Sequence, residues 1–158
     1  MKVIIATDGS DFSRAAVAKF CQTVVNPANL EIKIISVYEK LAPMAAEPFA
    51  VSAEYYREVE GAARKRAEVY LSDAADQIRK YFPNANMEIN TQTIMGAPGK
   101  TIVEMAQEWN ADLIVVGSHG YGFWSRTLLG SVSGSVVNHA PCSVLVVRQP
   151  ENSNGNKQ

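Results

Sequence analysis

The chain has 158 residues, of which 47 % are hydrophobic and 20 % charged, and its formal net charge is −1. These values are typical of one soluble globular domain, which needs neither disulfides nor a structural metal to fold. No basic run or stripe is present, which argues against a nucleic-acid partner. No apolar run approaches the roughly 18 residues of a membrane span, so we expect no membrane segment.

The two cysteines, Cys21 and Cys142, are far apart in the chain and neither belongs to a Cys-x-x-Cys pair. We therefore expect two reduced thiols, as in a protein of the cytosol. The opening residues, MKVIIATDGSD, hold an apolar run too short for a signal peptide. Together these features predict a cytoplasmic protein.

Short apolar runs rich in β-branched residues alternate with helical patterns along the whole chain. The expected strands span residues 2–7, 30–38, 86–95, 112–118 and 143–148. The expected helices span residues 11–25, 53–81 and 99–109, and residues 127–139 are mostly helical. Ser10 or Asp11 is expected to cap the first helix, and Pro83 to stop the second. The inner face of the second helix is marked by Val59, Ala63, Ala67, Tyr70, Ala74 and Ile78.

Strands that alternate with helices predict an α/β fold with a parallel sheet. Several strands are apolar on both faces, so helices should cover both sides of that sheet, and residues 86–95 alternate as an edge strand does. We expect one domain over residues 1–149 and a disordered polar tail over residues 150–158.

The stretch IMGAPGKT, residues 94–101, ends like a phosphate-binding P-loop. That signature needs a glycine five positions before its second glycine, and the residue five positions before Gly99 is Ile94. The spacing excludes a P-loop.

Ligands of open parallel sheets bind beyond the carboxyl ends of the strands, at a switch point in strand order. Two loops have that position: TDGSD after the first strand and GSHGYGFWSRTLLGS after the fourth. The second holds Gly117, Gly120, Gly122 and Gly130, and bare backbone N–H groups there can bind anions. Gly130 and Ser131 open the last helix, whose start is a further phosphate site; Ser131 can cap it or bind the phosphate.

The spacing Gly117-x2-Gly120-x9-Gly130-Ser131, between a strand and a helix, resembles the ATP-binding signature of the universal stress protein family. KVIIATDGSDFSRAAVAKF, GAPGKTIVEMAQEWNADLIVVGSHG and GSVSGSVVNHAPCSVLVVR resemble other parts of that family. The resemblance covers about residues 1–149, and GAPGKT is then similar to the family's turn near the nucleotide.

The resemblance implies a Rossmann-like fold of the adenine nucleotide alpha hydrolase type, with five strands in the order 3-2-1-4-5. It implies ATP as ligand, with Mg²⁺ expected beside the phosphates. Matched one by one, the residues implied to border the nucleotide are Ala6, Thr7, Asp8, Val37, Gly96, Gly117, Ser118, His119, Gly120, Gly130, Ser131, Val132 and Ser133.

The implied function is that of a nucleotide-dependent sensor or regulator in stress response, with at most slow hydrolysis or autophosphorylation, because no catalytic set is evident. In the implied order the fifth strand is an edge, apolar at Val144, Leu145, Val146 and Val147 without a protecting lysine or proline. We therefore expect a homodimer through this strand, and a tetramer stays open.

Each candidate residue also has a plainer interpretation. Asp8 could cap the first helix or fold the turn, and His119 could be a loop residue rather than a base or metal ligand. Tyr121, Phe123 and Trp124 could pack under the glycine loop, and Arg126 could be solvated rather than touch phosphates.

Three other functions are open at this point: an ATP-hydrolysing or nucleotide-transferring enzyme, an FMN protein of the flavodoxin type, and a scaffold without ATP. TDGSDFS replaces the S-G-G-x-D-S of ATP pyrophosphatases, and no paired-histidine motif of nucleotidylyltransferases is present, which disfavours the first. The intact glycine spacing disfavours the last.

Overall fold

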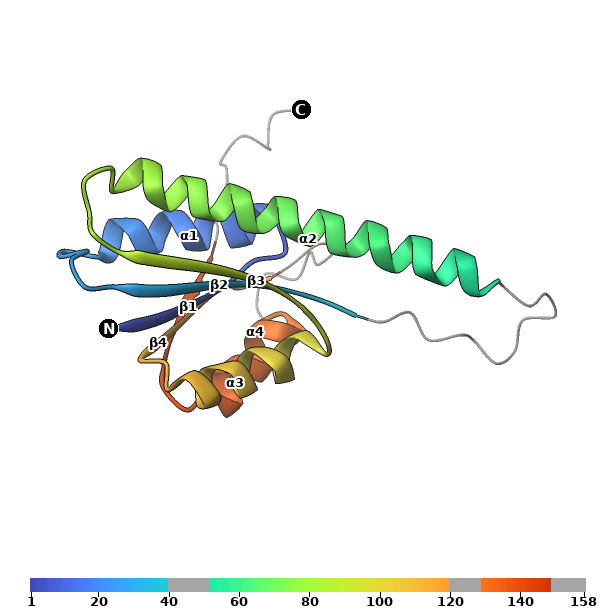
Figure 1. The fold of residues 1–158 in the computed structure, drawn as a ribbon. Helices are drawn as coiled ribbons and strands as arrows, with labels where there is room; N and C mark the ends of the chain where they lie inside the picture. The colour runs from blue at the N-terminus through green and yellow to red at the C-terminus, as the bar shows by residue number, and fades with distance from the viewer. Residues whose placement is uncertain (40–51, 120–128, 149–158) are drawn as a thin grey trace, which may run out of the picture.

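The computed structural model describes residues 1–39, 52–119 and 129–148. Helices and strands alternate along the chain (Figure 1). The strands are β1 (Lys2–Ala6), β2 (Glu31–Tyr38), β3 (Glu88–Met95), β4 (Leu113–Gly117) and β5 (Ser143–Val147). The helices are α1 (Asp11–Thr23), α2 (Ala53–Tyr81), α3 (Pro98–Trp109) and α4 (Ser131–His139).

The five strands form one parallel sheet in the order β3-β2-β1-β4-β5, which confirms the predicted order. β1 lies between β2 and β4, so the order in which strands are added changes direction there. β2 and β3 extend the sheet on one side of β1, and β4 and β5 extend it on the other. This is the switch point of a Rossmann-like sheet, and it brings the loops after β1 and β4 to one place.

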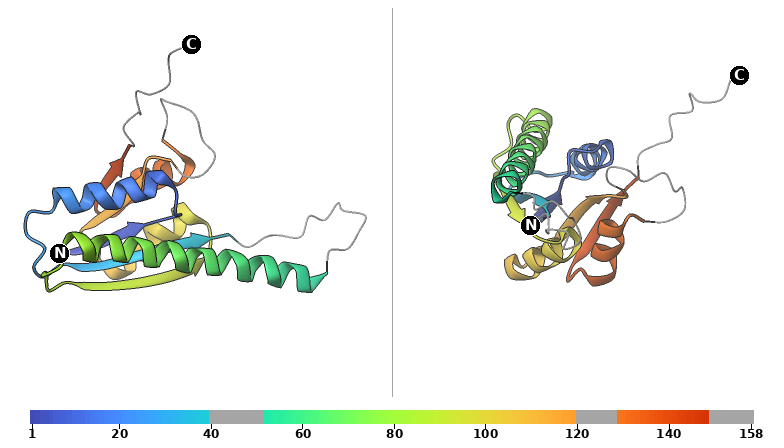
Figure 2. Two further views of the ribbon diagram at one scale, coloured as in Figure 1. Left: turned by 90° about the horizontal axis from the view of Figure 1, so that it is seen from above. Right: turned by 90° about the vertical axis from the view of Figure 1, so that its right-hand side faces the viewer.

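Helices cover both faces of the sheet, as predicted. α1 and α2 lie on one face, and α3 and α4 on the other (Figures 1 and 2). Each face has its own apolar core. Phe20, Leu71 and Ile78 belong to the core under α1 and α2, whereas Ile102 and Val136 belong to the core under α3 and α4. The buried runs of β1 and β4 serve both cores, because successive side chains of a strand point to opposite faces.

Local capping explains where the helices begin. The Ser10 hydroxyl accepts a hydrogen bond from the Ser13 N–H at the start of α1, and Ser52 accepts from Tyr55 in the same way for α2. Ser10 is thus the predicted cap, whereas Asp11 is the first helical residue. Gly130 is the cap of α4 and the helix begins at Ser131, which confirms that Gly130 and Ser131 open it, although Ser131 is not the cap.

Helix α2 extends well past the sheet (Figure 2). Its 29 residues are about 43 Å long at 1.5 Å per residue, whereas an eight-residue strand spans about 26 Å. The buried residues of α2 all lie between Ala67 and Ile78. The inner face predicted for this helix is buried at Ala67, Ala74 and Ile78, whereas Val59, Ala63 and Tyr70 are only partly buried.

Within the described ranges, no helix is both long enough and apolar enough to cross a bilayer. Cys21 and Cys142 are both free, as predicted, and Cys21 is buried against the core under α1 and α2.

Candidate functional site

A cavity of about 350 Å³ opens at the switch point, beyond the carboxyl ends of β1 and β4. It is closed on one side by the start of α3 and on another by the start of α4. The lining residues are Ala6, Thr7, Asp8, Ser13, Ile35, Val37, Pro98, Ile102, Val116, Gly117, His119, Gly130, Ser131, Val132 and Ser133.

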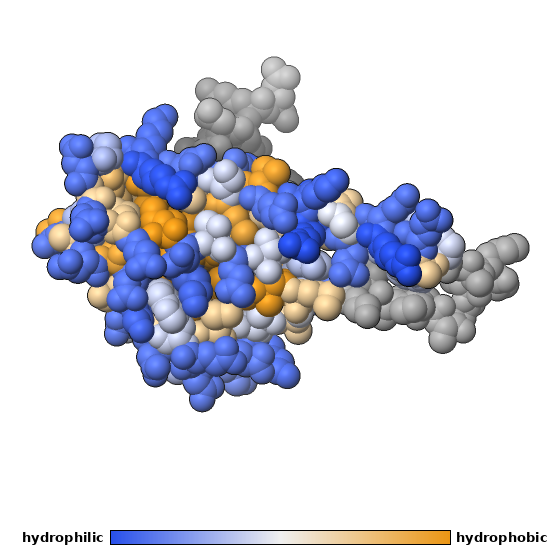
Figure 3. All heavy atoms as spheres, viewed as in Figure 1, coloured by the Kyte–Doolittle hydropathy of each residue, from blue (hydrophilic) through white to orange (hydrophobic). Residues whose placement is uncertain are grey.

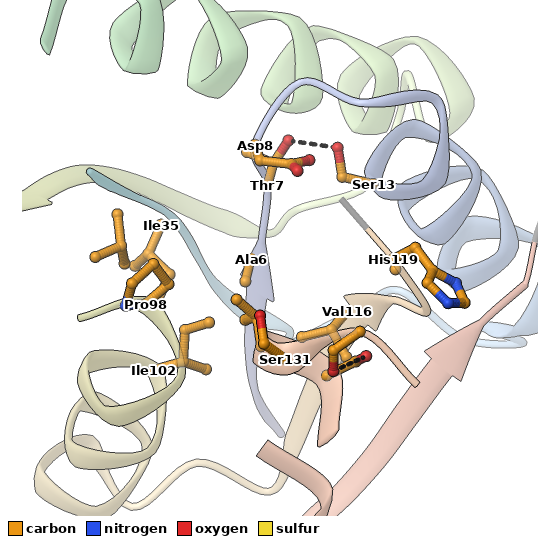
Figure 4. A pocket seen from close by; sticks show the side chains of 15 residues that line it. Ala6, Thr7, Asp8, Ser13, Ile35, Pro98, Ile102, Val116, His119 and Ser131 are labelled. Carbon is orange, nitrogen blue, oxygen red and sulfur yellow. Dashed lines mark hydrogen bonds between the residues drawn. The ribbon is translucent and has the colours of Figure 1, made fainter. Parts of the chain in front are cut away.

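The walls of this cavity differ in chemistry. Figure 4 shows Ile35, Pro98 and Ile102 together on one side, with the polar side chains of Thr7, Asp8 and Ser13 across from the start of α4. An apolar slot with a few convergent polar groups is the usual form of a small-molecule site.

The polar wall is held by hydrogen bonds within the turn after β1. The Thr7 hydroxyl donates to the Ser13 hydroxyl over 3.1 Å, and the Gly9 N–H donates to Thr7 Oγ1. Asp8 Oδ1 accepts from the Ser10 N–H and from the Ser10 hydroxyl, at 3.0 and 2.6 Å. Asp8 therefore folds the turn, as its plainer interpretation has it, and it also lines the cavity.

The start of α4 is joined to the end of β4. The Gly130 N–H donates to the carbonyl oxygen of Ser118 at 2.9 Å, and the Ser133 hydroxyl donates to the same oxygen at 2.7 Å. Gly130, the cap residue, has no side chain to accept from the first turn of α4, and Ser131, Val132 and Ser133 of that turn line the cavity. Such a helix start attracts an anion.

Two glycines of the predicted signature are explained by packing. A Cβ on Gly117 would lie 2.8–3.0 Å from backbone and Cβ atoms of Phe12, in the first turn of α1. A Cβ on Gly130 would lie 3.2 Å from the carbonyl oxygen of Ser118 and 3.3 Å from the Cα of His119. Gly130 has φ −62°, which any residue adopts, so close approach and not backbone conformation favours glycine there.

The glycine of GAPGKT has a similar role. A Cβ on Gly99 would come within 2.7 Å of both side-chain atoms of Ser135, so Gly99 lets α3 pack closely against α4. The Gly-Lys-Thr ending therefore serves helix packing, which agrees with the exclusion of a P-loop.

His119 is the only described lining residue besides Asp8 with an ionisable side chain. Its Nδ1 lies 3.1 Å from the Ser118 hydroxyl, and its ring packs against Phe12 with centroids 5.5 Å apart. Among the residues that the structure describes, no group of three or more His, Cys, Asp or Glu could hold a metal ion.

The cavity brings together most of the predicted site residues: Ala6, Thr7, Asp8, Val37, Gly117, His119, Gly130, Ser131, Val132 and Ser133. Gly96 and Ser118 do not line it. The Gly96 N–H donates to the Tyr38 carbonyl, and Ser118 is buried behind the turn, where its carbonyl holds α4. The predictions for Gly120, Tyr121, Phe123, Trp124 and Arg126, and for the tail over residues 150–158, lie outside the described residues.

Sequence reasoning missed part of the lining: Ser13, Ile35, Pro98, Ile102 and Val116. The position of Ser13 could have been predicted. It is the third residue of an amphipathic helix and lies on the same buried face of α1 as Ala16 and Val17. Such a buried hydroxyl needs a partner, and the nearest polar loop was TDGSD.

Comparison with known proteins gives the same assignment for the chain as a whole. A model of the universal stress protein family matches residues 1–148. A universal stress protein of Methanocaldococcus jannaschii is 34 % identical over 153 residues, which are 95 % of this chain and 83 % of that protein.

Solved structures extend the likeness to the fold. A universal stress protein in complex with cAMP is 28 % identical, with a TM-score of 0.65 over 93 % of this chain and 96 % of the other. A family protein from Arabidopsis thaliana with AMP bound is 18 % identical, with a TM-score of 0.68 over 96 % and 94 % of the two chains. Sheet order, glycine spacing and sequence thus agree, and the chain belongs to the universal stress protein family.

Proposed function

We propose that this chain binds ATP in the cavity at the switch point and acts as a nucleotide-dependent regulator in stress response. The observation that carries the proposal is the joint presence of an apolar slot and an uncapped helix start in one cavity. The cAMP and AMP bound to two structural relatives support an adenine nucleotide as the ligand.

The base would occupy the apolar wall. Ile35, Val37 and Val116 come from the ends of β2 and β4, and Pro98 and Ile102 from the first turns of α3. A planar, uncharged adenine fits such a slot, because its faces lose little by leaving water. The ribose would then lie toward Thr7, Asp8 and Ser13, whose oxygens can accept and donate hydrogen bonds.

The phosphates would lie at the start of α4. Backbone N–H groups of Ser131 and Val132 and the helix dipole supply partial positive charge there. No lysine or arginine is among the described lining residues, and Asp8 adds a negative charge. Mg²⁺ would offset the phosphate charge that no described lining cation offsets, held mainly by phosphate oxygens and water, as it commonly is, while Asp8 stays at the ribose.

We propose at most slow turnover. The described lining holds no cation to stabilise a transferring phosphoryl group, and no aspartate or glutamate beyond Asp8 to act as a base. An ATP-hydrolysing or nucleotide-transferring enzyme is the second candidate, and His119 is the residue that favours it, because a ring nitrogen can shuttle protons.

The nucleotide itself tests the proposal. One sample of the purified protein is denatured and the released small molecules are identified by mass spectrometry. A second sample, folded and freed of nucleotide, is titrated calorimetrically with ATP, AMP, cAMP and GTP. Adenine nucleotides should bind, and the affinity for GTP should be at least about tenfold weaker. Equal affinity for GTP would contradict an adenine-binding apolar wall. Hydrolysis within the roughly 1–100 s⁻¹ of ordinary kinases would favour the enzyme.

We also propose that two copies pair through β5. This strand is an edge of the sheet and pairs with β4 alone among the described strands. Val144 and Val146 pack toward the core under α3 and α4, whereas Leu145 and Val147 pack toward the core under α1 and α2. Both faces are thus partly covered, and the open backbone edge is what a second β5 would satisfy.

Light scattering at micromolar concentration tests this interface. Wild-type protein should have twice the mass of the 17.2 kDa chain, and Val146→Pro should have the mass of one chain. Val144→Ala is the matched control, because it trims a side chain of the same strand but keeps the backbone edge. A dimer that survives Val146→Pro would move the interface to another surface.

A further inference from the structure

The projecting half of α2 holds none of the buried residues of this helix, and it lies beyond the carboxyl edge of the sheet (Figures 1 and 2). On the face seen in Figure 3 it is mainly hydrophilic. An isolated helix of about 14 residues is only marginally stable in water. This part is supported locally by the Ser52 cap and by the ion pair between Arg64 and Glu68.

An exposed apolar seam runs along this half of the helix. Tyr55 and Val69 are 53 % and 57 % exposed, and they lie fourteen residues apart with the exposed Ala62 midway. Spacings of seven place the three side chains almost one above the other, like residues at one position of a heptad repeat. The seam points away from the sheet, because the buried residues Ala67, Leu71 and Ala74 lie on the other side of the helix.

The seam is self-complementary about Ala62. In an antiparallel pair related by a two-fold axis at Ala62, residues equally far from Ala62 on either side face each other. Tyr55 of one copy then meets Val69 of the other, and Ala62 meets Ala62, where its small side chain lets the helices approach closely.

The charges beside the seam obey the same symmetry. Glu58 and Lys65 are both exposed and lie seven residues apart, so they share one flank of the seam. In an antiparallel pair, residues of the same flank face each other across the interface. Glu58 lies four residues before Ala62 and Lys65 three after it, so Glu58 of each copy lies within one residue, about 1.5 Å along the axis, of the level of Lys65 of the other. Each flank contact then brings a carboxylate to an ammonium group, two ion pairs in all, with no like-charge contact on that flank.

We propose that the projecting half of α2 is a second interface of this protein, and that its partner is the same segment of another copy in antiparallel orientation. The contact spans about four helical turns, and one helix against one helix over that length buries less than the area of a stable interface, which is about 1,000 Å². This association is therefore weak and concentration-dependent. It depends neither on the nucleotide nor on pairing through β5.

Cross-linking at the two-fold axis tests the interface directly. In a Cys142→Ser background, Ala62→Cys should form a disulfide-linked dimer under mild oxidation, because the two thiols would meet at the axis. Ser72→Cys is the matched control, since Ser72 is also exposed on α2 but lies about a quarter of a turn from the seam. Cross-linking at the same rate in both variants would overturn the proposal.

A charge exchange separates this pairing from random collision. Added to Ala62→Cys, either Glu58→Lys or Lys65→Glu should slow cross-linking by about threefold to tenfold, because like charges then face each other. The double variant, Glu58→Lys with Lys65→Glu, should restore the original rate. A double variant as slow as the single ones would contradict the antiparallel register. Circular dichroism shows that the helix is retained in each variant.

Discussion

The Ser133 hydroxyl donates a hydrogen bond over 2.7 Å to the carbonyl oxygen of Ser118, fifteen residues earlier in the chain. This bond joins the start of α4 to the end of β4, and the Gly130 N–H strengthens the same junction. The hydroxyl of Ser133 is thus engaged within the protein. Its part in nucleotide binding would be to position the helix start, and not to give its proton to a phosphate.

Ser133→Ala should lower the free energy of unfolding by about 1 kcal/mol, because one buried hydrogen bond is lost while Gly130 still satisfies the Ser118 carbonyl. We expect the affinity for ATP to fall more than the affinity for adenosine, since the start of α4, where the phosphates would bind, is the part that moves. Ser135→Ala, on the same helix and outside the cavity lining, is the control. Denaturant unfolding and calorimetry measure both effects, and equal losses for ATP and adenosine would contradict the positioning role.

Asp8 should matter for the nucleoside and for the turn. Asp8→Ala removes both hydrogen bonds to Ser10, so stability should fall by about 1 kcal/mol and the affinities for adenosine and ATP by similar factors. Asp8→Asn keeps the oxygen that accepts from Ser10 and should retain the stability. Calorimetry with the two ligands decides: a variant that loses ATP but keeps adenosine would contradict this role.

Replacing a glycine inside α2 or inside α4 by alanine should stabilise the protein. A Cβ on Gly61 has nothing within 4 Å, and one on Gly134 meets only the Cβ of Leu129 at 3.9 Å. Gly61→Ala and Gly134→Ala should each raise the free energy of unfolding by about 0.5–1 kcal/mol, because alanine loses less backbone entropy in a helix.

Gly9→Ala is the opposite case, since φ is +73° there and a Cβ would overlap the ring of Tyr70. It should lower stability by about 2–4 kcal/mol. Thermal or urea unfolding of the three variants checks the predicted order of their stabilities. A destabilised Gly134→Ala would show that this glycine has a role in packing or assembly.

Cys21 should make the protein lose stability in alkali. Burial raises the pKa of its thiol from 9.0 to about 11. Between these values the unfolded chain releases a proton that the folded chain keeps, so the free energy of unfolding falls as pH rises, by about 2–3 kcal/mol in all. Urea unfolding from pH 8 to 10.5 should show a flatter pH dependence for Cys21→Ala; parallel curves would rule the thiol out as the cause.

The sequence predicts best what local interactions decide. The bounds of α2 follow from the Ser52 cap, a long run of helix-forming residues and Pro83 shortly after its end. The edge position of β3 follows from its alternating polar pattern. The opening of α4 at Gly130 and Ser131 was also predicted, whereas Leu129, which lies in the segment expected to be mostly helical, is not helical.

For the site, the pattern identifies the two loops that meet at the switch point but not the helices that close the cavity. Pro98 and Ile102 line it because Gly99 lets α3 lie close to α4, a contact between segments more than thirty residues apart. Gly96 was predicted in their place, because the turn and not the helix carries the family's pattern. The depth at which α3 packs is a tertiary property that spacing alone does not encode.

The binding of phosphates at the start of α4 is the central claim, and Gly130→Asp tests it with little risk to the fold. Aspartate is a favourable helix cap, and the φ of −62° at this position is one that aspartate adopts without strain. We therefore expect α4 to be at least as stable as in the wild type. The added Cβ requires the Ser118 turn to give by a few tenths of an ångström, and the uncharged Gly130→Asn variant requires the same shift. The carboxylate, however, would occupy the place proposed for the phosphates.

The measurement is isothermal titration of wild type, Gly130→Asp and the uncharged cap Gly130→Asn with ATP and with adenosine. We predict that Gly130→Asp loses about a hundredfold or more in ATP affinity through charge repulsion, keeps adenosine within a few-fold, and melts no earlier than the wild type. Gly130→Asn should lose much less ATP affinity. Unchanged ATP affinity in a folded Gly130→Asp protein would contradict phosphate binding at α4.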